Sequence, residues 1–209
     1  MITLPDNGLY AITDCMRLDS LSVYEKTEKI LSKGIALLQY RNKSKTGNSY
    51  IDTAKSIQSL CKKYSVPLII NDDVDLAIRI QAEGVHIGQN DMDCRKARIM
   101  LGPDKIVGVS CYNNLETAMQ AQAAGASYVA FGAFYFTNTK KDTVQADPDI
   151  LLRAKKQLSL PVTAIGGITP DNGRTLVNLG ADYLAVSNGL YQADDLDKAL
   201  QKYLELFIN

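Results

Sequence analysis

PLIINDDVDLAIRIQAEGVHIGQND, residues 67–91, contains the pattern that decides the fold of this chain. A continuous apolar run, PLIIN (67–71), is followed by a segment that Asp73 is placed to cap as a helix. A second apolar run, GVHIG (84–88), comes next. Runs that are apolar throughout, rather than at every second position, are typical of parallel strands covered on both faces. The stretch therefore predicts a strand, a helix and another strand.

The same unit repeats along the whole chain. Short apolar runs alternate with stretches of helical periodicity, for example 20–34 and 194–208, and Gly34, Gly125 and Gly180 stand where helices are expected to end. Eight strands and eight helical stretches predict an α/β protein, a (β/α)8 TIM barrel in which residues 1–209 form one domain. An open doubly wound sheet is the alternative, but the first strand lacks a following glycine-rich fingerprint. The expected strands are 8–13, 35–39, 67–71, 84–88, 106–110, 128–132, 162–166 and 183–187.

The composition narrows the class of protein. Lys+Arg and Asp+Glu are both 23, and this zero net charge argues against non-specific binding to nucleic acid or to an anionic membrane. No apolar run approaches the roughly 18 residues of a membrane span, and no signal peptide is expected. The scattered Cys15, Cys61, Cys94 and Cys111 indicate reduced thiols rather than disulfides or a zinc site. We expect a cytoplasmic protein, and the sequence leaves the oligomeric state open, a homo-oligomer included.

Polar residues stand where the predicted strands end, which is the face that carries the chemistry of such barrels. QYRNK (39–43) places Gln39, Arg41 and Lys43 at alternating positions, so they share one face if the strand continues. Arg41 and Lys43 would then meet one anion, the first as a fork and the second as a point charge. The alternative is a solvated strand end that carries two ordinary surface charges.

Small polar residues and glycines follow the last three strands. FTNTKKD (136–142) follows the sixth strand and suits either a solvated loop or a phosphate pocket. Gly166–Gly167 and Ser187–Gly189 follow the seventh and eighth strands, where loops of barrels commonly bind phosphate. Glycine lets backbone N–H groups approach an oxygen closely, although tight turn geometry alone would also explain these glycines.

Two carboxylates, Asp72 and Asp91, end neighbouring strands. Two carboxylates that meet near phosphates suit Mg²⁺, which takes hard oxygen ligands and leaves positions to water and substrate. The alternative for each is that it caps the following helix, and a cap is what we expect of Asp73. His86 is the only histidine and is expected to be structural; Cys111 is expected to be inert, so a Ser-His-Asp or Cys-His hydrolase is excluded.

In combination these motifs resemble those of the thiamine phosphate synthase family, also called thiamine-phosphate pyrophosphorylases. The resemblance covers nearly the whole chain through GLYAITD, QYRNK, LIINDDVDLA, GVHIGQNDMD, FTNTKKD, AIGGITPDN and GADYLAVSNGL. It implies a Mg²⁺-dependent transferase of thiamine biosynthesis that joins two small molecules. These are 4-amino-2-methyl-5-hydroxymethylpyrimidine diphosphate and 4-methyl-5-(2-hydroxyethyl)thiazole phosphate, and the products are thiamine monophosphate and pyrophosphate.

The resemblance also implies a role for each site residue. Pyrophosphate leaves well only if its developing charge is neutralised, and passage through a pyrimidine-methyl cation requires no general base. The implied catalytic residues are Arg41, Lys43, Lys140 and Ser110, and Asp72 and Asp91 would hold the metal. The pyrimidine diphosphate would contact Gln39, Arg41, Lys43, Asn71, Ser110 and Lys140. The thiazole phosphate would contact Thr137, Asn138, Thr139, Gly167 and the Ser187–Asn188 pair, of which either member aligns with a serine of the family.

Two other functions are compatible with such a barrel. One is a thiazole tautomerase, an isomerase that resembles the synthase but lacks much of the diphosphate machinery. The other is a non-catalytic barrel that binds a phosphorylated metabolite and regulates a partner. Retention of Gln39, Asp72, Asp91, Ser110 and Lys140 favours the synthase over both.

Overall fold

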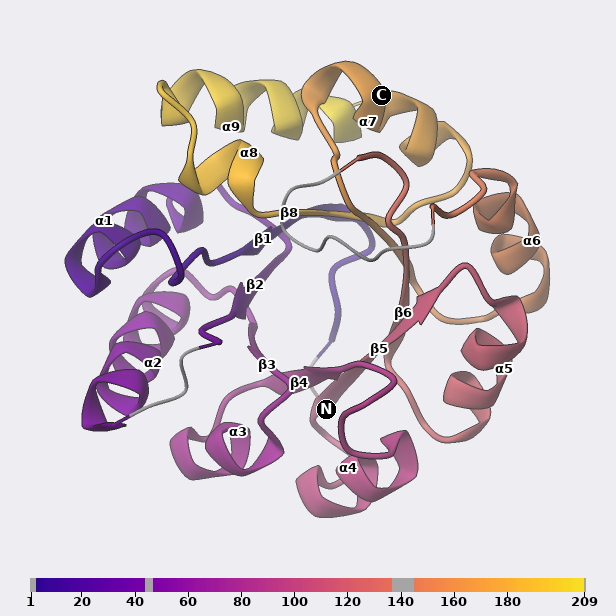
Figure 1. The fold of residues 1–209 in the computed structure, drawn as a ribbon, viewed down its shortest axis with the longest axis horizontal. Coiled ribbons are helices and arrows are strands. Elements are labelled where there is room, and N and C mark those ends of the chain that lie inside the picture. Colours follow the sequence, from indigo (N-terminus) through magenta and orange to yellow (C-terminus); the bar gives the residue numbers. More distant parts are fainter. Residues whose placement is uncertain (1–2, 44–46, 137–144, 209) are drawn as a thin grey trace.

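The computed structural model is a closed barrel of eight parallel strands surrounded by helices (Figure 1). It describes residues 3–43, 47–136 and 145–208, without the side chains of residues 47 and 48. Each strand pairs with its neighbour in sequence, and β1 closes the barrel by pairing with β8. The strands are β1 (Gly8–Ile12), β2 (Leu37–Tyr40), β3 (Leu68–Asn71), β4 (Gly84–Ile87), β5 (Ile106–Tyr112), β6 (Tyr128–Phe131), β7 (Val162–Ile165) and β8 (Tyr183–Val186). The predicted barrel is confirmed, and the open sheet is excluded.

The helices lie on the outside of the barrel (Figure 1). Within the described ranges there are nine α-helices rather than the eight expected, because a four-residue helix, α8, comes directly after β8. None of the described helices is long and apolar enough to cross a membrane. The helices are α1 (Ser20–Leu31), α2 (Gly47–Lys63), α3 (Val74–Ile80), α4 (Cys94–Leu101), α5 (Leu115–Ala123), α6 (Asp149–Gln157), α7 (Pro170–Asn178), α8 (Asn188–Tyr191) and α9 (Leu196–Leu204), followed by the 3-10 turn η1 (Glu205–Phe207).

Buried apolar side chains form two separate cores. The larger core lies between the strands and the helices, and the smaller one fills the inside of the barrel. Because both faces of each strand are buried in this way, the strands read as continuous apolar runs. The inner core is rich in tyrosine and consists of Tyr10, Ile12, Ala36, Leu37, Ile69, Ile106, Tyr128, Tyr183 and Ala185. Phenol hydroxyls are therefore buried directly beneath the face where the strands end.

The helix caps decide whether Asp72 and Asp91 cap the helices that follow them, which the sequence left open. Asp73 caps α3 by accepting a 2.8 Å hydrogen bond from the backbone N–H of Leu76, as predicted. Asp93 caps α4 in the same way. These two residues occupy the cap positions, so Asp72 and Asp91 do not cap helices and the cap alternative for them is wrong. The role of Asp72 and Asp91 at the ends of β3 and β4 is therefore not that of a helix cap.

Candidate active site

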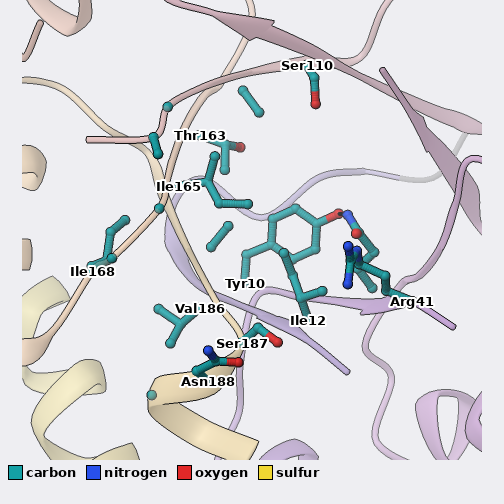
Figure 2. A pocket seen from close by; sticks show the side chains of 18 of the residues that line it. Tyr10, Ile12, Arg41, Ser110, Thr163, Ile165, Ile168, Val186, Ser187 and Asn188 are labelled. Carbon is teal, nitrogen blue, oxygen red and sulfur yellow. Dashed lines mark hydrogen bonds between the residues drawn. The ribbon is translucent and has the colours of Figure 1, made fainter. Parts of the chain in front are cut away.

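A cavity of about 390 Å³ lies where the strands end, at the face expected to carry the chemistry (Figure 2). Residues from all eight strands or the loops that follow them contribute to its wall. Its predicted members are Gln39, Arg41, Asn71, Ser110, Gly167, Ser187 and Asn188. The structure thus brings seven of the predicted site residues into one cavity, although they are spread over most of the sequence. Thr137, Asn138, Thr139 and Lys140 lie outside the described residues.

Gln39 and Arg41 occupy one side of the cavity. Gln39 is the third residue of β2, and its buried amide donates a 2.8 Å hydrogen bond from Nε2 to the hydroxyl of Tyr10. Arg41 lies beyond the strand, because β2 ends at Tyr40. The condition under which Gln39, Arg41 and Lys43 would share one face of a strand is therefore not met. Thr13 instead fixes the backbone of Arg41, since its Oγ1 accepts from Arg41 N at 2.8 Å. Figure 2 shows the Arg41 side chain at the edge of the cavity.

Lys43, Asp72 and Asp91 are not among the described residues that line the cavity, but contacts link them to its rim. Lys43 Nζ lies 3.9 Å from Asp72 Oδ2. The backbone N–H of Asp72 donates to the carbonyl of His86 at 2.8 Å, and the backbone of Asp72 has a positive φ of 63°. Asp91 Oδ2 accepts a 2.7 Å hydrogen bond from the N–H of Gly88. Both aspartates are thereby attached to the end of β4.

The donor set of this aspartate pair fits Mg²⁺. Two carboxylates supply hard oxygen ligands and leave most of an octahedral shell to water and phosphate, which is how Mg²⁺ is usually bound. Within the described ranges there is no group of three or more His, Cys, Asp or Glu side chains that would form a complete protein cage for a metal.

The glycines after β7 are needed for a close approach of two loops. Gly166 and Gly167 have positive φ values of 102° and 64°. A Cβ on Gly166 would lie 2.4 Å from Cβ of Ala133, and a Cβ on Gly167 would lie 2.4 Å from the carbonyl oxygen of Phe136. Turn geometry therefore explains both glycines, and phosphate binding by Gly167 stays a prediction.

Ser187 and Asn188 lie on the opposite side of the cavity from Ser110, at the start of α8 (Figure 2). Ser187 precedes the helix, and its carbonyl accepts from the N–H groups of Leu190 and Tyr191. Both residues line the cavity, so the structure leaves open which of them meets a phosphate.

Three further residues line the cavity although the sequence assigned them no contact with a substrate: Tyr10, His86 and Thr163. His86 is 8 % exposed and is hydrogen-bonded through both ring nitrogens, to Tyr128 and to Ser110, so its expected structural role includes a contact with a predicted site residue. Thr163 is fully buried on β7, and its Oγ1 has no hydrogen-bond partner among the described residues. A ligand or a water molecule in the cavity would satisfy that hydroxyl.

The cysteines take no part in this site. All four are free thiols, as predicted. Cys111 is fully buried next to Ser110, and burial raises the pKa of its thiol to about 12. Such a group stays protonated at neutral pH and is a poor nucleophile, which agrees with the expectation that Cys111 is inert.

Comparisons with known proteins identify the family of this chain and agree with its fold. A family model described as thiamine monophosphate synthase matches residues 9–190. The thiamine-phosphate synthase of Nitrosomonas eutropha is 47% identical over 202 residues, which cover 96% of this chain and 94% of that protein. The enzyme of the same name from Nitrosospira multiformis is 44% identical over 200 residues, covering 96% and 85%.

A solved structure extends the similarity to three dimensions. Thiamine phosphate pyrophosphorylase from Pyrococcus furiosus superposes with a TM-score of 0.84 at 29% sequence identity, covering 96% of this chain and 95% of that one. These matches confirm the family resemblance and the transferase class of enzyme that the motifs indicated. This chain belongs to the thiamine monophosphate synthase family.

Proposed function

We propose that this barrel condenses 4-amino-2-methyl-5-hydroxymethylpyrimidine diphosphate with 4-methyl-5-(2-hydroxyethyl)thiazole phosphate to form thiamine monophosphate and pyrophosphate. The observation that carries the proposal is the division of the cavity wall. Gln39, Arg41, Ser110, Ser187 and Asn188 all line it, and Ser110 lies on the opposite side from Ser187 and Asn188 (Figure 2). One cavity thus has room for two partners, each with polar groups of its own.

The chemistry is a substitution at the pyrimidine methylene carbon. The bond from this carbon to the diphosphate oxygen breaks, the oxygen keeps the electron pair, and the thiazole nitrogen forms the new C–N bond. The step needs no proton transfer, so its main requirement is stabilisation of the charge that develops on pyrophosphate. Arg41, which lines the cavity, and Lys43 would provide it, with Lys140 as the further cation that the sequence predicts.

Asp72 and Asp91 are the residues that would hold Mg²⁺. When bound there, the metal supplies positive charge to the phosphate oxygens. Lys43, which lies 3.9 Å from Asp72, would meet the same diphosphate group. Asn71 lines the cavity one residue before Asp72 and would orient the pyrimidine diphosphate together with Gln39.

The thiazole phosphate is assigned to the other side of the cavity. Gly167, Ser187 and Asn188 line that side, and the sequence adds Thr137, Asn138 and Thr139. Holding both substrates in one cavity converts a bimolecular reaction into one between fixed neighbours, which supplies a large part of the rate enhancement. The partners of the protein are thus small molecules, without nucleic acid or membrane. The reduced cysteines suit the cytoplasm, and a homo-oligomer is compatible with this function.

The proposed function is tested by incubating the purified protein with both substrates and Mg²⁺. We expect thiamine monophosphate and pyrophosphate to appear in equal amounts, and chelation of the metal to stop the reaction. Thiazole isomerisation without any condensation would instead establish the tautomerase alternative and would overturn the proposal.

A further inference from the structure

Five side chains from five strands form one continuous chain of hydrogen bonds at the floor of the cavity, and we call this chain the relay. Its four bonds have lengths between 2.7 and 2.9 Å, which is the range of well-formed hydrogen bonds. In order, Gln39 Nε2 bonds to Tyr10 Oη (2.8 Å), Tyr10 Oη to Tyr128 Oη (2.7 Å), Tyr128 Oη to His86 Nδ1 (2.9 Å), and His86 Nε2 to Ser110 Oγ (2.8 Å). The relay thereby connects two predicted pyrimidine contacts, Gln39 and Ser110, through three residues, Tyr10, Tyr128 and His86, to which the sequence assigned no substrate contact.

Packing holds the middle of the relay in place. The rings of His86 and Tyr128 stack with centroids 5.6 Å apart, and Tyr10 meets Tyr128 edge to face at 5.9 Å. Tyr128 fits only because position 108 on β5 is a glycine. A Cβ there would lie 2.1 Å from Cζ of Tyr128 and 2.3 Å from its hydroxyl. The interior of the barrel is therefore shaped around this tyrosine.

The direction of the relay follows from counting protons. Tyr10 and Tyr128 are essentially fully buried, and burial raises the pKa of both phenols, so each keeps its proton. Tyr10 accepts from Gln39, so its own proton goes to Tyr128. The proton of Tyr128 then goes to Nδ1 of His86.

The direction of the hydrogen bond between His86 and Ser110 follows from the same count of protons. With Nδ1 as an acceptor, neutral His86 carries its proton on Nε2 and donates it to Ser110 Oγ. Ser110 is left with its own proton to donate into the cavity. With Gln39 Nε2 facing Tyr10, the opposite direction would leave the buried proton of Tyr10 without an acceptor among the described residues, which is costly.

The two ends of the relay present different groups to the cavity. Gln39 gives its Nε2 to Tyr10, so Oε1 is the atom it offers to a ligand, and that oxygen can only accept. Ser110 offers a donor. A 4-aminopyrimidine matches this arrangement, because its amino group donates and its ring nitrogens accept. A 4-oxopyrimidine would place a carbonyl oxygen against Gln39 Oε1, where neither atom can donate.

We propose that the relay selects a 4-aminopyrimidine over a 4-oxopyrimidine by holding Gln39 as an acceptor and Ser110 as a donor. Tyr10, Tyr128 and His86 are then positioning residues, which act on the substrate through Gln39 and Ser110. The substrate part of this proposal rests on the proposed function. The direction of the relay rests on the hydrogen bonds together with the orientation of the Gln39 amide, whose Nε2 faces Tyr10.

The direction is measured on the single histidine of the chain, whose imidazole ¹⁵N signals are unambiguous. We expect the Nε2–H tautomer in the wild-type protein, and a shift toward the Nδ1–H tautomer in Tyr128→Phe, which removes the donor to Nδ1. Tyr183→Phe is the matched control: this ring packs edge to face on Tyr128, but its hydroxyl donates to the carbonyl of Pro5. An Nδ1–H tautomer in the wild type, or an unchanged spectrum in Tyr128→Phe, would overturn the assigned direction.

Selectivity is measured as the ratio of kcat/KM for the 4-amino and 4-oxo pyrimidine diphosphates. Tyr10→Phe frees the Gln39 amide to rotate, so we expect the ratio to fall about 10-fold to 100-fold. Tyr128→Phe should lower it as well, whereas Tyr183→Phe should keep the wild-type ratio. Unchanged ratios in both relay variants would refute the selection. If the wild type turns over neither compound, both the proposed function and the proposed selection of a 4-aminopyrimidine fail. The ¹⁵N spectrum of His86 still decides the direction of the relay in that case.

Discussion

The Asp72→Asn enzyme is expected to lose turnover by about 10²-fold to 10³-fold while keeping its fold. Asparagine has the shape of aspartate and tolerates the positive φ of this position, so the substitution removes the charge without disturbing the strand end. The loss follows from the assignment of Asp72 as a metal ligand, because a neutral amide binds Mg²⁺ far more weakly than a carboxylate does. Turnover across a Mg²⁺ titration and binding of Mn²⁺ in the presence of pyrophosphate measure the effect.

The neighbouring residue provides the control for this experiment. Asp73 is adjacent to Asp72, but its carboxylate caps α3, and asparagine is as good a cap as aspartate. Asp73→Asn should therefore keep nearly normal turnover and an unchanged Mg²⁺ requirement. If Asp72→Asn behaved in the same way as Asp73→Asn, the assignment of the metal to this aspartate would be wrong.

The Arg41→Ala enzyme is expected to lose about 10²-fold to 10³-fold in kcat/KM for the pyrimidine diphosphate. Hydrogen bonding to Thr13 uses only the backbone of Arg41, so truncation of the side chain leaves the loop anchored. The guanidinium is a fork that binds phosphate oxygens in pairs, and Arg41→Lys should restore only part of the loss because lysine is a point charge. The KM for the thiazole phosphate should change little, since that substrate is assigned to the other side of the cavity.

Steady-state kinetics with each substrate varied in turn give these values. Arg79→Ala removes an exposed arginine from the last turn of α3 and serves as the charge-matched control, with expected wild-type kinetics. Equal losses for both substrates in Arg41→Ala, or nearly normal rates, would contradict the assignment of Arg41 to the leaving pyrophosphate.

Much of the fold could be predicted from the sequence because the barrel strands are buried on both faces. Each apolar run coincides with a strand, and the boundaries differ by one or two residues. The short helix α8 was not predicted, since four residues carry no helical periodicity. Whether β2 continued as far as Lys43 stayed open, because alternation of polar residues does not show where pairing with the neighbouring strand stops.

Some residues of the candidate site could likewise be predicted from the sequence, and others could not. Gln39, Asn71 and Ser110 could be predicted because they are polar residues at the ends of apolar runs. Tyr10 and Tyr128 could not, since a tyrosine inside such a run looks like any other core residue. Their hydroxyls meet only because the register of the closed barrel turns both side chains inward, and register is a property of strand pairing rather than of local sequence. The signal available in the sequence is the presence of tyrosines in runs otherwise filled by aliphatic residues.

The most direct test of the account is a crystal structure of the protein with thiamine monophosphate, pyrophosphate and Mn²⁺ in place of Mg²⁺. The account predicts an anomalous metal signal shared by the carboxylates of Asp72 and Asp91, with pyrophosphate between the metal and Arg41. It also predicts the aminopyrimidine ring between Gln39 and Ser110. A metal bound away from both aspartates, or a product bound outside this cavity, would contradict it.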